Sequence, residues 1–213
     1  MKKKLLMFDL DGTLIDSISG IVNSVNVTRV QYGFEALPKE LVTSFTGDGI
    51  AKLTERSFAD VGLPASLDEV KSRVEENYKA DPIFGTDLYE GVRDTLEILH
   101  DKGYLLAVIS NKPESVGKMI LGSLNIMPLL CENIGGGRFP LKPAPDPINY
   151  LLEKYEVAKE DAMMVGDNHT DVNCGKNAGV KSCFCKYGYG FLDETLPDFE
   201  IDSFAELLSV LEK

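Results

Sequence analysis

Long apolar segments are missing from this sequence, which argues against a membrane-spanning helix. The first uninterrupted apolar segment, Leu5 to Phe8, has four residues and ends at Asp9, whereas a spanning helix needs about 20 apolar residues. Three lysines precede this segment, as they would in a secretory signal, but four apolar residues are too few for the hydrophobic part of such a signal. We therefore expect neither a signal peptide nor a membrane partner.

Basic residues are scarce relative to acidic ones. The 22 lysines and arginines are outnumbered by 34 aspartates and glutamates, so the formal net charge is −12. Proteins bind nucleic acid mainly through clustered basic side chains that neutralise phosphates, and we expect no nucleic-acid partner here. A small anionic metabolite is compatible with this charge, provided that its site contains local cations.

Cysteine and histidine are also few and do not form a metal-binding pattern. The four cysteines lie at positions 131, 174, 183 and 185, and the chain has two histidines. This spacing fits neither a disulfide framework nor a closed zinc site. We expect reduced thiols in a cytoplasmic protein, and any metal site should use oxygen ligands.

Four short apolar segments, each ending in polar residues, indicate the strands of a sheet. They are too short for helices and too continuously apolar for a half-exposed sheet, so they are typical of parallel strands covered on both faces. The segments are Leu5–Phe8, Leu105–Ile109, Ala162–Val165 and Lys181–Cys185. Helical patterns lie between and after them, at 92–102, 147–153, 171–178 and 203–211. This alternation predicts a doubly wound α/β core.

Residues 17–82 differ, because they carry helical patterns and no strand pattern. Apolar residues recur at helical spacing from Ile18 to Val25 and from Ile50 to Val61, and Ser66 begins a capping-box sequence ahead of a third helix. We predict an all-helical cap at 16–83, inserted into a core formed by 1–15 and 84–213. The two linkers between cap and core would serve as a pair of hinges.

Carboxylates gather at the predicted ends of two strands. Asp9 and Asp11 leave the first strand, and Asp167 and Asp171 follow the third. Ligands of an open parallel sheet bind at the carboxyl ends of its strands, so we expect these side chains to converge. Two unit charges 4 Å apart repel by about 4 kcal/mol at an effective dielectric constant of 20, and a hard cation such as Mg²⁺ would relieve that repulsion. Taken singly, Asp11 could form a turn and Asp171 could cap a helix.

Polar and basic residues elsewhere could hold a phosphate. Ser110 and Asn111 offer a hydroxyl, an amide and backbone N–H groups at a strand–helix junction, although a plain helix cap would use the same residues. Lys142 is followed by prolines at 143, 145 and 147, which restrict the backbone. A lysine held in this way could neutralise both a nucleophile and a phosphate; the alternative is a solvated surface lysine.

In this order, the motifs resemble those of the haloacid dehalogenase-like (HAD) superfamily. Residues 9–17 are similar to its first motif, 110–112 to its second, 142–143 to its third and 166–171 to its fourth. The helical insert resembles the C1 cap of that superfamily, and the resemblance spans nearly the whole chain. It implies a Rossmann-like core.

The resemblance implies a separate catalytic or metal-binding role for each of the four aspartates. Asp9 would attack phosphorus and form an aspartyl-phosphate, while Asp11 would protonate the leaving group and then activate water. Mg²⁺ would be held by the carboxylates of Asp9 and Asp167 and by the backbone carbonyl of Asp11. Asp171 would order the ligands of this ion.

The same resemblance places other residues around the substrate. Ser110 and Lys142 would bind the phosphoryl oxygens, with Asn111 beside them. Gly47 and Gly49 would let a cap loop approach the substrate closely, although an ordinary turn between helices would explain them equally well.

Together these features predict a Mg²⁺-dependent phosphatase for a small phosphorylated metabolite. Dehalogenases of the superfamily lack the second aspartate, so Asp11 favours a phosphate ester or anhydride as substrate. Segments 46–49, 186–190 and 197–204 are similar to the phosphoglycolate phosphatase branch, which makes phosphoglycolate the leading candidate. Alternatives are an inorganic pyrophosphatase, a sugar phosphomutase, and a non-enzymatic interaction protein whose acidic cluster is vestigial.

Three features stay open on the sequence alone. Arg138 follows three glycines and could contact an anionic substrate, although a solvated arginine is the simpler interpretation. His169 lies between two motif aspartates, but oxygen-rich metal chemistry does not require it. The protein could be a monomer or a homodimer.

Overall fold

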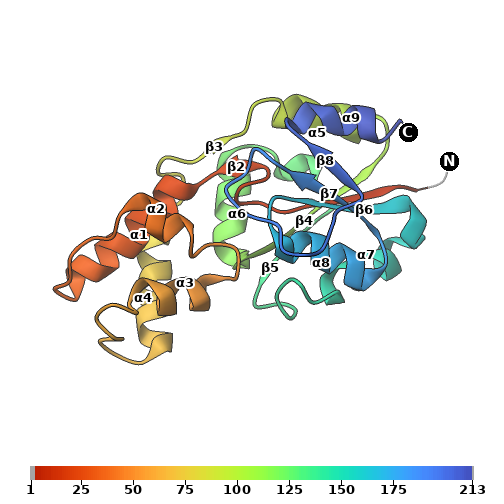
Figure 1. The fold of residues 1–213 in the computed structure, drawn as a ribbon. Coiled ribbons are helices and arrows are strands. Elements are labelled where there is room, and N and C mark those ends of the chain that lie inside the picture. The colour runs from red at the N-terminus through yellow and green to blue at the C-terminus, as the bar shows by residue number, and fades with distance from the viewer. Residues whose placement is uncertain (1–2, 213) are drawn as a thin grey trace.

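The computed structural model describes residues 3–212, in which six parallel strands form one sheet with helices on both faces (Figure 1). The strand order is β5-β4-β1-β6-β7-β8, and every pairing between neighbours is parallel. The predicted fold class, a doubly wound α/β core with a helical insert, is confirmed. The strands are β1 (Leu5–Phe8), β4 (Leu105–Pro113), β5 (Glu132–Gly136), β6 (Ala162–Gly166), β7 (Lys181–Cys185) and β8 (Phe199–Ile201).

β1 lies inside the sheet, at the point where the chain changes direction across it. Phe8, the last residue of β1, is paired with Val108 of β4 on one side and with Val165 of β6 on the other. From β1 the chain adds β4 and β5 on one side, and then crosses to add β6, β7 and β8 on the other. The carboxyl ends of β1, β4 and β6 therefore meet at one edge, the usual place for a ligand in such a sheet.

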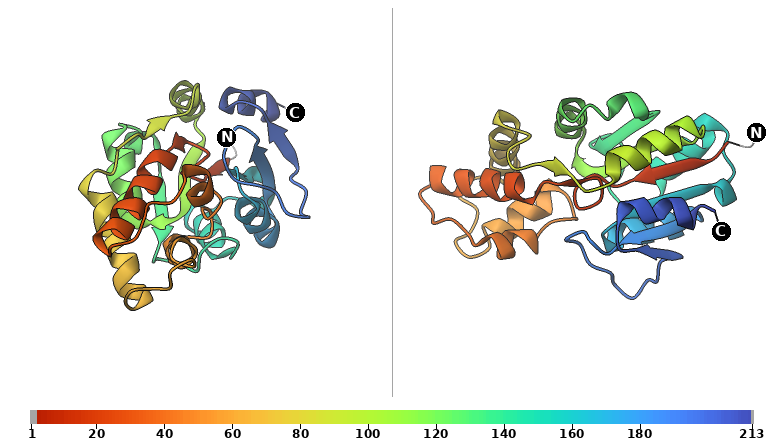
Figure 2. Two further views of the ribbon diagram at one scale, coloured as in Figure 1. Left: turned by 60° about the vertical axis from the view of Figure 1, so that its left-hand side comes forward. Right: turned by 90° about the horizontal axis from the view of Figure 1, so that it is seen from above.

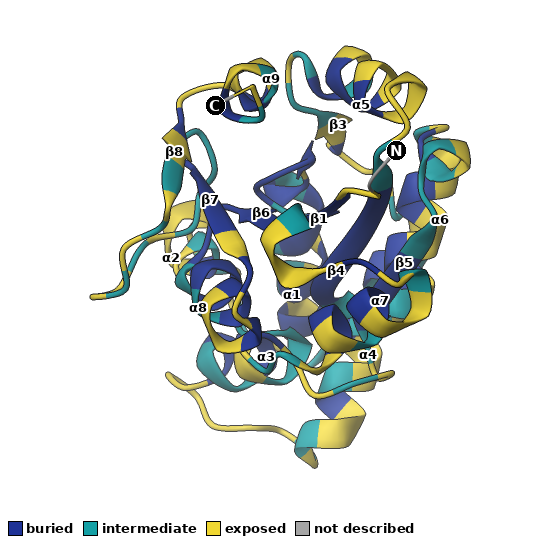
Figure 3. Cartoon of the chain, turned by 90° about the vertical axis from the view of Figure 1, so that its right-hand side faces the viewer, coloured by how far each residue is buried: buried dark blue, intermediate teal, exposed yellow. Residues whose placement is uncertain are grey.

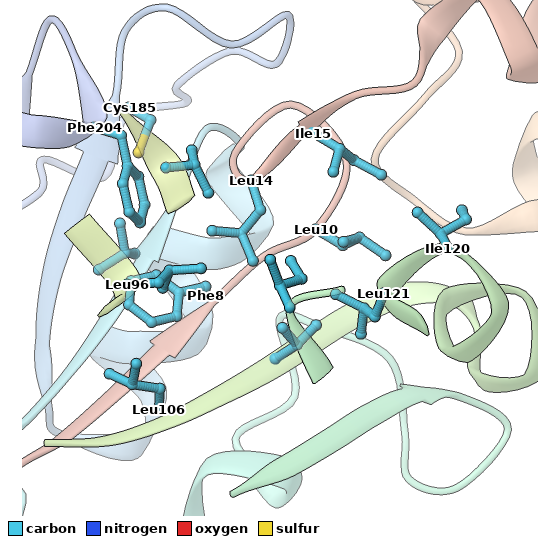
Figure 4. Packing of buried hydrophobic residues seen from close by; sticks show 14 of the residues in the cluster. Phe8, Leu10, Leu14, Ile15, Leu96, Leu106, Ile120, Leu121, Cys185 and Phe204 are labelled. Atoms are coloured by element: carbon cyan, nitrogen blue, oxygen red, sulfur yellow. The ribbon is translucent and has the colours of Figure 1, made fainter. Parts of the chain in front are cut away.

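Alternating side chains of β1 face two different hydrophobic clusters, which explains its continuous apolar sequence. Leu6 and Phe8 face α5 (Val92–Asp101), α6 (Glu114–Ser123) and α9 (Leu207–Val210). Leu5 and Met7 face α7 (Asp146–Tyr155) and α8 (His169–Ala178). Figure 3 shows the buried strands between exposed helix surfaces, and Figure 4 shows Phe8 packed among Leu96, Leu106 and Phe204.

Four helices follow the first strand and form a unit at one end of the molecule (Figure 1). They are α1 (Ile18–Gln31), α2 (Lys39–Thr43), α3 (Ile50–Ser57) and α4 (Leu67–Ala80). α4 begins as its sequence predicts, because the Ser66 side chain accepts a hydrogen bond from the backbone N–H of Glu69. Within this unit the buried guanidinium of Arg29 forms an ion pair with Asp60 at 2.8 Å.

The two connections between the helical unit and the sheet pair with each other. β2 (Ile15–Asp16) and β3 (Asp87–Leu88) form an antiparallel ribbon, in which Ile15 lies opposite Leu88. The sequence predicts plain linkers in these places. The pairing arises because the chain leaves and re-enters the sheet side by side in opposite directions, so each segment satisfies backbone groups of the other.

Some elements are absent from the sequence prediction. Strands β5 and β8 and helices α2 and α6 were not predicted, and the helical pattern at 203–211 is divided into a 3₁₀ turn, η3 (Phe204–Glu206), and the short α9. Two further 3₁₀ turns are η1 (Met127–Leu129) and η2 (Lys159–Asp161). α9, the last helix, lies away from α1–α4 (Figure 2). Within residues 3–212, none of the helices has the length and apolar character to cross a membrane.

Candidate active site

Three carboxylates converge where β1 and β6 end. Asp9 follows β1 directly, and its backbone N–H donates to the carbonyl oxygen of Val165 at 2.9 Å. Asp167 follows β6, and Asp171 lies in the first turn of α8. One carboxylate oxygen from each of these three aspartates lies within 4.8 Å of the others. The structure therefore brings together three of the four aspartates that the sequence predicts to converge.

Lys142 lies between two of these carboxylates. Its ammonium nitrogen is 2.8 Å from Asp9 Oδ1 and 2.6 Å from Asp171 Oδ1, and only 1% of its side chain is exposed. Asn111 fixes the lysine backbone from both sides: its Oδ1 accepts from the Lys142 N–H at 2.8 Å, and its Nδ2 donates to the Lys142 carbonyl at 3.1 Å. Asn111 thus holds Lys142 in position, and Lys142 is not a solvated surface residue.

The cluster has an excess of negative charge. Lys142 contacts two of the three carboxylates and is the ammonium group paired with them, so ionised Asp9, Asp167 and Asp171 leave two charges uncompensated. Burial is the main cause that raises the pKa of Asp9 to about 7, although Lys142 opposes the rise. Burial also raises the pKa of Asp167, and the charges of Asp9 and Asp171 add to that effect. A divalent cation would restore the balance.

Asp11 points to a different partner. Both of its carboxylate oxygens contact the ammonium of Lys112, at 2.9 and 3.0 Å, and Oδ1 also accepts a hydrogen bond from the Ser17 hydroxyl. Ser17 Oγ in turn lies 3.2 Å from Tyr189 Oη. Burial alone would lower the pKa of Lys112, but Asp11 and Tyr78 together outweigh it, and the pKa is raised. The Asp11 side chain is therefore fixed outside the three-carboxylate cluster.

Glycines and hydrogen bonds fix the position of Asp167. Its carboxylate accepts from the Thr13 hydroxyl at 3.1 Å and from the Gly190 N–H at 2.8 Å. A Cβ atom at Gly12 or at Gly188 would overlap the Asp167 side chain. Gly12 also has a φ of +82°, which side chains other than hydrogen rarely permit.

Asp171 both caps a helix and contacts the lysine. Its Oδ2 accepts from the backbone N–H of Asn168 at 3.0 Å, which completes a capping box at the start of α8. Its Oδ1 holds Lys142. Asp171 therefore caps α8, as one of the two interpretations of the sequence predicts, and in addition contacts Lys142.

The loop before α3 reaches from the helical unit to the sheet edge. The carbonyl of Gly47 accepts a hydrogen bond from Asn111 Nδ2 at 3.0 Å. A Cβ at Gly47 would overlap the Asn168 side chain, and a Cβ at Gly49 would lie 2.8 Å from Leu141 Cδ1. Both glycines have positive φ, +103° and +86°. This geometry fits close approach of the loop rather than a simple turn between helices.

A cavity of about 90 Å³ lies between the helical unit and the sheet edge. Asp9, Asp11, Ser110, Lys112 and Asp167 form its polar floor. The helical unit contributes a mainly apolar wall, made by Ile21, Ile50, Leu53, Val74 and Tyr78. Such a cavity can bind a small molecule that has an anionic group at one end.

Arg138 and His169 lie outside this arrangement. Arg138 is paired with Glu132 at 3.0 Å and donates to Tyr150 Oη at 2.8 Å, so its guanidinium is engaged elsewhere. The His169 ring stacks on Phe191, with the ring centroids 4.8 Å apart. Neither residue belongs to the cavity lining or to the carboxylate cluster.

Several residues of the site were not assigned a role from the sequence. Lys112, Ser17 and Tyr189 surround the Asp11 carboxylate, and Thr13 and Gly190 hold Asp167. All five lie in segments 9–17, 110–112 or 186–190, which resemble sequence motifs of the HAD superfamily or of its phosphoglycolate phosphatase branch. The contacts of Lys112 with Asp11, of Tyr189 with Ser17 and of Thr13 with Asp167 could not be derived, because each joins positions 101 or more residues apart.

Comparison with known proteins agrees with this geometry. Residues 6–185 match the family model for haloacid dehalogenase-like hydrolases. The chain is 36% identical over 219 residues to the phosphoglycolate phosphatase of Haemophilus influenzae strain KW20/Rd, covering 98% of each chain. It is 34% identical over 210 residues to the phosphoglycolate phosphatase of Aquifex aeolicus, covering 98% of this chain and 97% of the other.

A solved structure has the same fold over its whole length. It is described as a predicted phosphoglycolate phosphatase from Haemophilus somnus 129PT, and it superposes with a TM-score of 0.93 at 30% identity, covering 99% of each chain. The family match, the full-length relatives and the common architecture lead to one conclusion. The chain belongs to the haloacid dehalogenase-like hydrolase family.

Proposed function

We propose that this chain is a Mg²⁺-dependent phosphatase that hydrolyses a small phosphorylated metabolite through an aspartyl-phosphate, with phosphoglycolate as the leading candidate. The proposal depends mainly on one observation: Asp9 lies at the end of β1, in contact with a buried lysine and beside two further carboxylates. Relatives that are 34–36% identical over the whole chain and are named phosphoglycolate phosphatase support this substrate.

The donor set fits Mg²⁺. The carboxylates of Asp9 and Asp167 and the backbone carbonyl of Asp11 would hold the ion, and all of these donors are oxygen atoms, as a hard cation prefers. Asp171 is already bonded to Lys142 and to the Asn168 backbone, so it would order the site from outside. The excess of negative charge in the cluster supports a divalent ion. When bound, Mg²⁺ would supply charge neutralisation for the nucleophile and the phosphoryl group.

The side chains of the site can carry out two successive displacements. An Asp9 carboxylate oxygen attacks phosphorus, the bond from phosphorus to the ester oxygen breaks, and Asp11 gives a proton to that oxygen. In the second step Asp11 takes a proton from water as the water oxygen attacks phosphorus, which releases phosphate and restores Asp9. Lys142 and Ser110 stabilise the phosphoryl oxygens throughout. The apolar wall of the cavity limits entry of other water.

Replacement of the nucleophile tests this function. Asp9→Asn is expected to abolish phosphate release from phosphoglycolate in the presence of Mg²⁺, because the amide cannot form the acyl phosphate. The matched control is Asp101→Asn, which alters an aspartate with an 86% exposed side chain outside the site. Release of phosphate by Asp9→Asn at the parent rate would refute the mechanism. Parallel assays with pyrophosphate, and with a sugar 1-phosphate plus a bisphosphate activator, distinguish the pyrophosphatase and phosphomutase alternatives.

We also propose a division of the chain into two units. Residues 16–83 would act as a cap over a core formed by 1–15 and 84–213, and the β2–β3 ribbon would be the hinge. A cytoplasmic location would suit the four free cysteines, and burial raises the pKa of Cys174 and of Cys183 to about 12, which keeps these thiols protonated. The protein would be a monomer or a homodimer.

A further inference from the structure

Positive charge is scarce in the cavity above the carboxylate cluster. Among the described residues that line it, Lys112 is the one cation, against the carboxylates of Asp9, Asp11, Glu75 and Asp167. A second anionic group on the substrate, beyond the phosphate, would be removed from water in this cavity and would need a cationic partner. The lining offers Lys112 for that contact.

Lys112 is held in a geometry that leaves room for a ligand. Its ammonium nitrogen contacts the two Asp11 oxygens at 2.9 and 3.0 Å and lies 4.3 Å from the ring centroid of Tyr78. An ammonium group has three N–H donors; the Asp11 carboxylate contacts the ammonium with two oxygens, and the remaining donor lies beside Tyr78, with which a substrate anion would share it. The neighbouring apolar wall, which includes Leu53 and Val74, excludes water and strengthens a charge pair.

The position of Asp11 defines which anion can reach this ammonium. In the proposed mechanism the Asp11 carboxylate contacts the ester oxygen of the substrate, and Lys112 contacts that same carboxylate. The ammonium therefore lies within a few ångströms of the ester oxygen. In the phosphate ester of a 2-hydroxy acid, a single carbon separates the ester oxygen from the carboxylate, so this carboxylate lies at the short distance from the ester oxygen that the Lys112 ammonium can reach.

We infer that Lys112 binds the carboxylate of the substrate and thereby selects phosphate esters of short 2-hydroxy acids. This inference rests on the proposed phosphatase function and assigns the recognition of the leaving group. The two lysines then bind opposite ends of the substrate. Lys142, beside Asp9, binds the phosphoryl group, and Lys112, beside Asp11, binds the carboxylate.

The test compares two substrates of equal length. Phosphoglycolate carries the carboxylate, and ethyl phosphate has a methyl group in its place. For the parent protein, kcat/KM should be higher with phosphoglycolate. Lys112→Gln is expected to reduce the ratio of the two kcat/KM values by about 10- to 100-fold, the range for loss of a hydrogen bond to a charged group, chiefly through KM for phosphoglycolate. Lys112→Arg should recover part of this preference, because it keeps the charge.

Controls separate this inference from its alternatives. Lys118→Gln alters an exposed lysine on α6 outside the cavity, and the preference for phosphoglycolate should survive it. If Lys112→Gln loses the same factor in kcat/KM with both substrates, then the lysine acts only by holding Asp11, and the inference is overturned. A parent protein that hydrolyses both substrates equally, in an Asp9-dependent manner, would overturn it while leaving the phosphatase function intact. If Lys112→Gln does not fold, the inference can be tested by calorimetry, which measures how tightly inactive Asp9→Asn binds each of the two substrates. Equal affinity for phosphoglycolate and ethyl phosphate would overturn the inference.

Discussion

At the scale of single residues, the site is built around charges that do not balance within the protein. Lys142 is almost fully buried between Asp9 and Asp171, and Asp167 lies beside them with hydrogen bonds but no cation. Buried carboxylates without enough positive charge cost stability, because the protein interior solvates ions poorly. The raised pKa values of Asp9 and Asp167 express that cost. A bound cation would remove it, so metal binding and stability should be linked.

This linkage predicts a pH dependence for the metal-free protein. Folding raises the pKa of Asp9 from its ordinary 3.8 to about 7, so between these values the folded state binds the proton that the unfolded state has lost. The contribution of Asp9 to the free energy of unfolding is therefore fully present below about pH 4, and it is lost as the pH rises through 7. In EDTA, the melting temperature of the parent should fall relative to that of Asp9→Asn between pH 5 and 7.5, by a few degrees.

Mg²⁺ should reverse this trend, since it favours the ionised carboxylates. The stabilisation on adding Mg²⁺ is therefore expected to grow with pH over the same interval. Melting curves of the two proteins with and without Mg²⁺ measure both effects. If the parent and Asp9→Asn lose stability in parallel, Asp9 does not carry the titration and the assigned charge imbalance is wrong.

At the scale of elements, sequence and structure agree where strands are covered on both faces. β1, β6 and β7 follow the predicted apolar segments closely, and Asp167 comes directly after β6. The predicted strand end at Ile109 is wrong, because β4 continues to Pro113; Ser110 and Asn111 therefore lie within β4 and do not cap α6. The missed strands β5 and β8 lie at the two edges of the sheet, where fewer apolar side chains are needed. β5 has the sequence Glu-Asn-Ile-Gly-Gly, which carries no strand periodicity.

The same reasoning explains what could be predicted of the site. Asp9 and Asp167 follow from strand register, because their strands are neighbours and end together. The contacts of Lys112 with Asp11 and of Tyr189 with Ser17 depend on loop conformations, which local sequence patterns do not encode. The close approach of Gly47 to Asn168 likewise follows from packing between two units.

The loop before α3 allows a prediction at this scale. Gly47→Ala should reduce kcat/KM for the substrate, because the new Cβ would overlap Asn168 and push the loop away from the cavity. Gly62→Ala is the matched control, since Gly62 also has a positive φ, +76°, but its Cβ would meet no atom within 4 Å. Both variants should lose about 1–3 kcal/mol of stability from backbone strain. Steady-state kinetics and melting curves separate the two effects, and equal activity losses in both variants would contradict a positioning role for the loop.

At the scale of the whole molecule, the cavity lies between helices α1–α4 and the sheet edge, and the proposed cap and core are connected through the β2–β3 ribbon. The polar floor belongs to the sheet edge and most of the apolar wall to α1, α3 and α4. A direct hydrogen bond from Asn111 to the Gly47 carbonyl links the two sides away from the ribbon. Opening at the ribbon would separate this contact, and it would let substrate enter and phosphate leave.

Hydrogen exchange can detect this opening. Mg²⁺ together with inorganic phosphate should draw the loop onto the sheet edge, because the phosphate would add contacts near Ser110 and Lys142 on one side of the cavity. We expect slower exchange of backbone amides at 46–50 and in the β2–β3 ribbon. Amides inside α1 and α4 should change little, since these helices pack against each other within the cap in either state. Asp9→Asn/Asp167→Asn, which removes two metal-binding carboxylates, should show no such protection. A uniform slowing over the whole chain would indicate general stabilisation and would refute a hinged cap.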